Sequence, residues 1–250
     1  MTYCLGIVTK HGLVMASDSR TNAGTDQASV CRKMFTFEIP GERSLVLLTS
    51  GSLSLSQSVL SLLQADFDKG EGLARVDSMY EAARAVGTQV RRVREVDCDP
   101  LEKDGYHFNV HFLLGGQIGT EAPQLYMIYP QGNPLRAAEE SPYLQIGETK
   151  YGRPILDRGI KFDTTTLEEA AKYALISIDS TMRSNVTVGP PIDIVAYHAG
   201  ELKITRRRRL AENDPHLVQT RRQWEQVLRR AIHEMPLVAF SDDGMPAIHG

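Results

Sequence analysis

The first fifty residues alternate short apolar runs with turn residues. Residues 3–9 (YCLGIVT) and 13–17 (LVMAS) have the length and character of strands, and the glycine of Lys10-His11-Gly12 suits a tight turn between them. Residues 34–38 (MFTFE) alternate as a half-buried strand does, and 44–49 (SLVLLT) form a buried run. This region therefore predicts consecutive antiparallel strands.

The periodicity then changes to that of helices. Apolar residues recur at helical spacing over Leu53–Phe67, which follows the candidate cap Ser50-Gly51-Ser52, and again over Ser78–Glu95. A polar link over Asp97–Gly105, with Pro100 in it, is expected next. The remaining expected strands are Asn109–Gln117, Gln124–Tyr129, Tyr143–Ile146, Ile192–His198 and Glu201–Thr205. The remaining expected helices are Tyr151–Arg158, Leu167–Met182, with Thr164–Thr166 as cap candidates, and Pro215–Met235.

This order of elements predicts an α+β fold. Strands, two helices, more strands, more helices and closing strands suggest two sheets stacked face to face with helices outside them, a four-layer αββα sandwich. We expect one domain over residues 1–205 and an extension over 206–250, in which the helix near 215–235 precedes a loose tail.

Composition narrows the class of protein. Hydrophobic residues make up 42% of the 250 residues, and the formal net charge is −3, which argues against a general nucleic-acid binder. We expect no membrane span and no secretory signal, and three cysteines without metal-ligand spacing fit a reducing cytoplasm. His107 and His111 would lie roughly 13 Å apart on a strand, too far for one ion. No metal or organic cofactor is expected.

Thr2 is the candidate nucleophile. It follows Met1 directly, so removal of one methionine would leave a hydroxyl and a free α-amine on the same residue. An α-amine has an ordinary pKa of roughly 8, so it can act as the base for its own hydroxyl. A nearby cation would favour the neutral amine, and a carboxylate would hold that cation in place. Lys33 and Asp18 are the candidates for these two roles.

These residues belong to a larger motif. Thr2, the hairpin, Ala16-Ser17-Asp18-Ser19-Arg20, Gly24, Arg32-Lys33 and Thr49-Ser50-Gly51 resemble the amino-terminal region of proteasome β-subunits. The segments SDSRTNAG, RKM and IGETKYGRPILDR are most similar to Anbu, the ancestral β-subunit branch of the bacterial homologues. The resemblance covers most of residues 2–205.

The resemblance implies a role for each residue. It implies the N-terminal-nucleophile (Ntn) hydrolase fold, with Thr2, Asp18 and Lys33 as catalytic residues. The backbone N–H of Gly51 would bind the oxyanion, although this glycine also suits the sharp turn between strand and helix. Cys31, Thr49 and Leu53 would line a small, mainly apolar specificity pocket, and Arg20 would be an accessory residue.

The chain also departs from the family's pattern. Glu148 stands where proteasome β-subunits have a serine. Where they have an Asp three residues before a Ser, this chain has Ser184 and Thr187, so that Thr187 replaces the Ser but Ser184 does not replace the Asp. Glu148 is therefore expected to contact the ammonium form of the terminus and to raise its pKa. A smaller fraction of the amine would then be neutral and able to act as a base at neutral pH, so the reaction would be slower.

The expected function is a threonine-type hydrolase of peptide or amide bonds, assembled as a homo-oligomer in the cytoplasm. Two alternatives stay open: acyl transfer to an amine by the same nucleophile, and a catalytically weak scaffold.

The helix around Trp224 can dock on a neighbouring subunit or on its own domain. A closed ring and an open helical turn both remain possible, as does an unfolding ATPase partner. The four arginines Arg206–Arg209 lack interleaved aromatic residues, so we do not expect a nucleic-acid partner.

Overall fold

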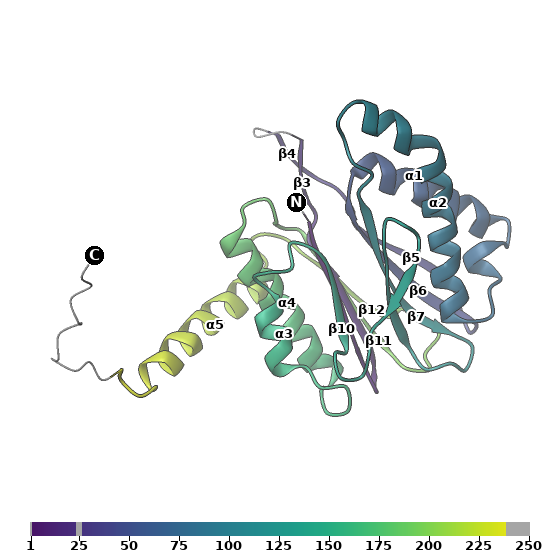
Figure 1. Cartoon of the computed structure of the whole chain (residues 1–250). Coiled ribbons are helices and arrows are strands. Elements are labelled where there is room, and N and C mark those ends of the chain that lie inside the picture. The colour runs from purple at the N-terminus through teal and green to yellow at the C-terminus, as the bar shows by residue number, and fades with distance from the viewer. Residues whose placement is uncertain (1, 24–26, 239–250) are drawn as a thin grey trace, which may run out of the picture.

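The computed structural model describes residues 2–23 and 27–238. Two five-stranded antiparallel sheets lie face to face, and helices cover both outer faces (Figure 1). The first sheet has the order β10 (Tyr143–Gly147), β1 (Tyr3–Thr9), β2 (Gly12–Ser17), β11 (Ile192–His198), β12 (Arg206–Leu210). The second has the order β5 (Met34–Ile39), β6 (Arg43–Gly51), β7 (Val110–Ile118), β8 (Gln124–Ile128), β9 (Pro134–Arg136).

Helices complete the four layers. Helices α1 (Leu53–Asp68) and α2 (Met79–Lys103) pack on the second sheet, and α3 (Arg153–Gly159) and α4 (Leu167–Ser184) pack on the first. Helix α5 (Pro215–His233) begins against α4 and extends away from the body (Figure 1). A 3₁₀ turn, Gly72–Ala74, lies between α1 and α2, and a separate hairpin is formed by β3 (Arg20–Ala23) and β4 (Gln27–Val30). The predicted αββα sandwich is confirmed.

Three apolar clusters fill the three spaces between the four layers. The strand β1 shows how one segment serves two of them: Tyr3, Leu5 and Ile7 face α4, whereas Cys4 and Val8 face the second sheet. Because both faces of this strand are buried, its sequence reads as a continuous apolar run. A Cβ on Gly6 would lie 2.7 Å from the Met15 sulfur, so the glycine allows close packing here.

Local sequence signals explain the ends of the helices. The predicted cap of α4 is present: the Glu169 backbone N–H donates to the Thr166 hydroxyl over 3.2 Å, and the Thr166 N–H donates to the Glu169 carboxylate over 2.9 Å. At α5, the carboxylate of Asp214 accepts from the N–H groups of His216 and Leu217. Both helices therefore begin where the sequence offers a capping side chain.

Two sequence predictions were wrong. The link expected at 97–105 is helical as far as Lys103, because Pro100 falls in the last turns of α2, where only one hydrogen bond is lost. The strand expected at Glu201–Thr205 is absent, and the arginine run after it forms β12 instead. The hairpin β3–β4 and the strand β9 were not predicted.

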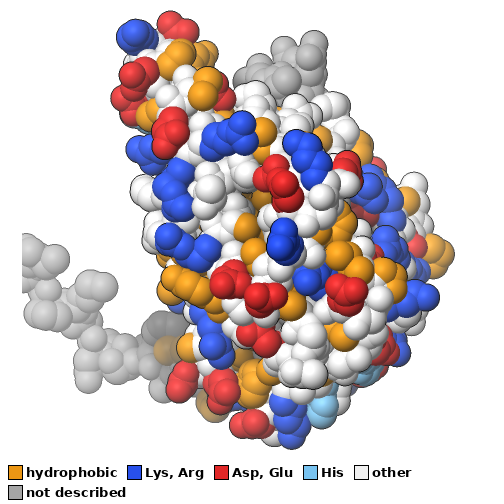
Figure 2. Space-filling view, turned by 90° about the vertical axis from the view of Figure 1, so that its right-hand side faces the viewer, with side chains coloured by type: hydrophobic (Ala, Val, Ile, Leu, Met, Phe, Trp, Pro, Cys, Tyr) orange, Lys and Arg blue, Asp and Glu red, His pale blue; other side chains and the backbone are white. Residues whose placement is uncertain are grey.

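The first sheet continues beyond residue 205, since β12 pairs with β11 along Ile192–Ala196. The loose tail expected over 236–250 lies outside the described residues from 239 onward. None of the described helices is long and apolar enough to cross a bilayer. On the side of the molecule that carries α1 and α2, hydrophobic side chains are interspersed with charged ones (Figure 2).

The packing of α2 gives a stability prediction. In an exposed helix, replacing Gly by Ala stabilises by about 1 kcal/mol. At Gly87, however, an added Cβ would lie 2.0 Å from the carbonyl oxygen of Gly132, which is a backbone atom and cannot turn aside as a side chain can. We therefore expect Gly87→Ala to lower the free energy of unfolding by about 1–2 kcal/mol, measured by chemical denaturation. Thr88→Ala, at the next and exposed position, is the control and should not destabilise.

Candidate functional site

The β1–β2 hairpin sets Asp18 beside the amino-terminal end of the chain. Cys4 pairs with Ser17 in the ladder, so Asp18, at the end of β2, lies opposite Tyr3. The Asp18 N–H donates to the Tyr3 carbonyl over 3.1 Å, and the Tyr3 N–H donates to Asp18 Oδ1 over 3.0 Å. These two bonds fix the carboxylate one residue from Thr2.

Asp18 is fully buried and accepts hydrogen bonds from four nitrogen donors. Oδ1 accepts from the Tyr3 N–H and from Lys33 Nζ, and Oδ2 accepts from the N–H groups of Arg20 (3.2 Å) and Gly189 (3.1 Å). Burial raises the pKa of Asp18 above its usual value, while the Lys33 ammonium and the backbone donors act in the opposite direction. Because every partner is a donor, the carboxylate is bound in its ionised form.

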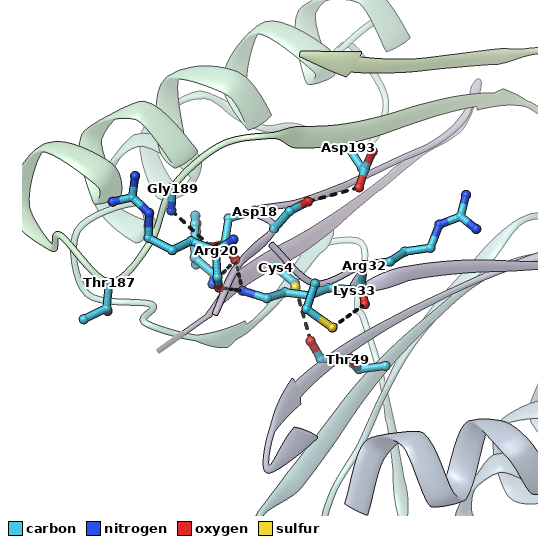
Figure 3. Close-up of polar contacts among 12 residues, drawn as sticks. Cys4, Asp18, Arg20, Arg32, Lys33, Thr49, Thr187, Gly189 and Asp193 are labelled. Atoms are coloured by element: carbon cyan, nitrogen blue, oxygen red, sulfur yellow. Dashed lines mark hydrogen bonds and ion pairs between the residues drawn. The ribbon is translucent and has the colours of Figure 1, made fainter. Parts of the chain in front are cut away.

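Lys33, the residue just before β5, is the positive partner of Asp18. Its Nζ lies 2.7 Å from Asp18 Oδ1 and 2.6 Å from the Arg20 carbonyl oxygen, and the side chain is only 6% exposed (Figure 3). The Lys33 carbonyl accepts from the Thr49 N–H over 3.0 Å, which joins the start of β5 to the end of β6. The sequence prediction that Asp18 holds Lys33 therefore agrees with the geometry.

A cavity of about 580 Å³ opens beside this ion pair. Thr2, Lys33 and Gly51 all line it, although they come from three different segments of the chain. Gly51 ends β6 with φ of +102°, and a Cβ there would lie 2.3 Å from the Asn109 carbonyl oxygen. Glycine is thus required both by the backbone conformation and by the close approach of β7.

The three candidate specificity residues also lie together. Cys31, Thr49 and Leu53 line this cavity and an adjoining one of about 520 Å³ between β5, β6 and α1. Ser56 and Arg32 are shared by the two cavities, so polar and charged groups accompany the apolar ones that the sequence predicted. Together the two spaces can receive a side chain of a ligand bound beside Thr2.

Glu148 is buried next to Thr2. Its N–H donates to the Thr2 carbonyl over 2.7 Å, and its side chain is only 6% exposed. The carboxylate accepts from the side-chain amide of Asn185 over 3.1 Å, and Lys150 Nζ lies 3.7 Å away. The preceding Gly147 has φ of +88°, and a Cβ there would lie 1.9 Å from the Thr2 carbonyl oxygen. This segment therefore packs directly on the backbone of Thr2.

The other accessory candidates, Ser184, Thr187 and Arg20, make different contacts. Ser184 is the exposed last residue of α4, and the next residue, Asn185, is the one that contacts Glu148. The Thr187 hydroxyl and N–H both donate to the Asn185 side-chain oxygen. Arg20 contributes its backbone to the Asp18–Lys33 pair, while its guanidinium donates to the Val186 carbonyl over 2.7 Å.

Sequence reasoning did not assign three residues to the site, although it considered one of them, His111, as a metal ligand. Asn185 and Gly189 reach it from the loop before β11, which lies 171 residues from Asp18 in the chain, so no local pattern indicates them. His111 lines the cavity from β7, and burial lowers its pKa below the ordinary value. No metal-binding group of three His, Cys, Asp or Glu side chains is found among the residues that the structure describes.

Comparison with known proteins agrees with this fold. Residues 2–196 match the model of the family described as proteasome subunit. The proteasome subunit beta of Haloferax volcanii is 27% identical over 207 residues, which are 82% of this chain and 76% of that protein.

Solved structures of Anbu proteins are more similar. The helical assembly of the Anbu complex from Pseudomonas aeruginosa is 44% identical, with a TM-score of 0.90 over 95% of this chain and 98% of that chain. Anbu from Yersinia bercovieri is 42% identical, with a TM-score of 0.88 over 95% of this chain and 100% of that chain. This chain belongs to the proteasome subunit family, in its Anbu branch.

Proposed function

We propose that this protein is a threonine-type hydrolase that cleaves peptide or amide bonds inside a homo-oligomer. One observation carries the proposal: Thr2, Gly51 and Lys33, which is paired with the buried Asp18, line a single cavity. A protein with only a scaffold role would gain nothing from a buried ion pair beside its terminal threonine, and burying two charges costs free energy. Membership of the proteasome subunit family supports the same reaction class.

The proposed reaction starts once Met1 is removed. The α-amine of Thr2 takes the proton of its own hydroxyl as Oγ attacks the substrate carbonyl, and the carbonyl π electrons move onto the oxygen. The Gly51 N–H stabilises this oxyanion. The intermediate then collapses: the C–N bond breaks, and the ammonium group of Thr2 returns the proton to the leaving amine. Water next attacks the acyl-threonine ester while the α-amine takes its proton. The bond between the acyl carbon and Oγ then breaks, the proton returns to Oγ, and the second product leaves as a carboxylic acid.

Two charged groups near Thr2 are expected to shift the pKa of its α-amine in opposite directions. The Lys33 ammonium disfavours a second positive charge nearby and so keeps the amine neutral, whereas the Glu148 carboxylate favours the protonated amine. Asp18 holds the Lys33 ammonium in place over 2.7 Å. We therefore expect the reaction at neutral pH to be slower than it would be with a serine in place of Glu148.

Assembly would proceed through α5. Leu217, on its first turn, is buried against α4, and the Arg221 guanidinium lies 2.6 Å from Asp179. The same helical stripe continues through Leu228 and Ile232, which are 45% and 62% exposed. A second copy of this chain is the proposed occupant of this stripe, because a closely similar Anbu protein forms a helical assembly. Enclosure within the assembly would restrict access to Thr2.

We predict that Met1 is removed from the active protein. A retained Met1 would convert the α-amine of Thr2 into an amide without basicity. We expect the active protein to begin at Thr2 and to form a covalent adduct with a peptide epoxyketone, both seen by intact-mass measurement. Thr2→Ala is the control and should not be labelled. Active protein that still carries Met1 would contradict this mechanism.

A further prediction concerns the role of Lys33. Lys33→Ala removes the charge beside the amine, and Lys33→Arg places a planar guanidinium where a compact ammonium fits. We expect both variants to lose labelling by the epoxyketone, at least about 100-fold in rate. Lys172→Ala, at an exposed position on α4, is the matched control and should label at the wild-type rate.

The stability of Lys33→Ala should depend on pH. Without the ammonium, burial raises the pKa of Asp18 further, so the folded protein binds this proton more tightly than the unfolded chain does. The loss of stability relative to the wild type is therefore largest at neutral pH, and it shrinks as the pH falls toward about 4, the ordinary Asp pKa. Thermal melts of both proteins at pH 7 and pH 5 measure this difference. An equal deficit at both pH values would show that Asp18 is not the partner.

The assembly prediction concerns α5. Light scattering should give a mass several times that of the 27.8 kDa chain. Leu228→Glu together with Ile232→Glu should lower this mass at equal protein concentration, because the charges disrupt an apolar contact. Gln226→Glu, on the opposite side of α5, should leave it unchanged. A wild-type protein that is a monomer at all micromolar concentrations would exclude the assembly.

A further inference from the structure

Arg32 occupies the point where three cavities meet. It lines the cavity of Thr2, the adjoining cavity of Cys31 and Leu53, and a third of about 180 Å³ between the edges of β5 and β12. Its side chain is exposed and points away from the Asp18–Lys33 pair (Figure 3). A ligand that extends from Thr2 along either neighbouring cavity therefore passes Arg32.

The cations near Arg32 are already engaged. Lys33 is paired with Asp18, and the Arg20 guanidinium donates to the Val186 carbonyl. In the third cavity, Arg207 and Arg209 are paired with Glu38 and Asp193 over 3.0 and 2.7 Å. Within the described residues, the Arg32 side chain makes no hydrogen bond or ion pair. Its guanidinium is thus available to a ligand.

The cavity offers little negative charge to compete for this guanidinium. Among the described residues that line the Thr2 cavity there is no Asp or Glu, and Asp18 lies beneath it at 0% exposure. Asp193, in the third cavity, accepts from both Arg209 and Ser19. His111 has its pKa lowered by burial and stays neutral at pH 7, so it adds no charge of either sign.

We infer that Arg32 selects substrates with an acidic side chain close to the bond that Thr2 attacks. This inference rests on the proposed function of Thr2. A guanidinium binds a carboxylate through two parallel hydrogen bonds, and its planar donors fit Asp or Glu better than a neutral amide. Peptides rich in Glu or Asp are the substrate class that this arrangement fits.

The test uses the assembled protein and peptide epoxyketones that differ at one position. Glu, Gln or Lys is placed at each of the three residues nearest the electrophile, and the labelling rate is read by intact mass. With the wild type at low salt, the best Glu probe should react about fivefold faster than its Gln counterpart, and the preference should shrink as salt is added. Equal rates for Glu and Gln at all three positions would overturn the inference.

Variants assign the preference to Arg32. Arg32→Gln should abolish the Glu preference while keeping the reaction with the Gln probe, and Arg32→Glu should shift the preference to Lys. Arg92→Gln, the same change at an exposed position on α2, should retain the wild-type ratio. A Glu preference that survives in Arg32→Gln would also overturn the inference.

The same experiment separates the two proposals. Labelling of the wild type by the Gln probe, absent in Thr2→Ala, supports the nucleophile whatever the charge preference. Failure of every probe to label the wild type would instead count against the proposed function itself.

Discussion

The ion pair between Asp18 and Lys33 is the interaction on which the site depends. Moving two charges out of water costs several kcal/mol, which a single contact does not offset. Here the carboxylate also accepts hydrogen bonds from three backbone N–H groups, which belong to β1, to the start of β3 and to the loop before β11. One buried group thus joins segments that are far apart in the chain, and Thr2 takes its position from the strand that this group holds.

The fold was largely predictable where local patterns decide it. The apolar runs predicted β1, β2 and β6, and the cap candidates Thr164–Thr166 predicted the start of α4. The errors came where tertiary contacts override composition. The arginine run of β12 does not look like a strand, yet pairing with β11 and four nearby carboxylates stabilise it there.

The candidate site was predictable only in part. Thr2, Asp18, Lys33 and Gly51 could be named because each lies at a strand end or a turn with a recognisable spacing. Asn185 and Gly189 could not, although the resemblance named Ser184 and Thr187 beside them, because these two residues act through a side-chain amide and a backbone N–H that any loop could offer. Their contacts exist only once the two ends of the first sheet have come together.

The strand β12 disfavours one way in which copies of this chain could join. An edge strand normally offers its unpaired backbone groups to another chain, which extends the sheet from molecule to molecule. This edge carries four consecutive arginines, each bound to a carboxylate of the same chain: Glu201, Glu38, Asp214 and Asp193. A strand added from a neighbour would have to displace this fixed layer of charge. These ion pairs therefore oppose growth by sheet extension, the route by which an exposed edge strand leads to fibre-like aggregation.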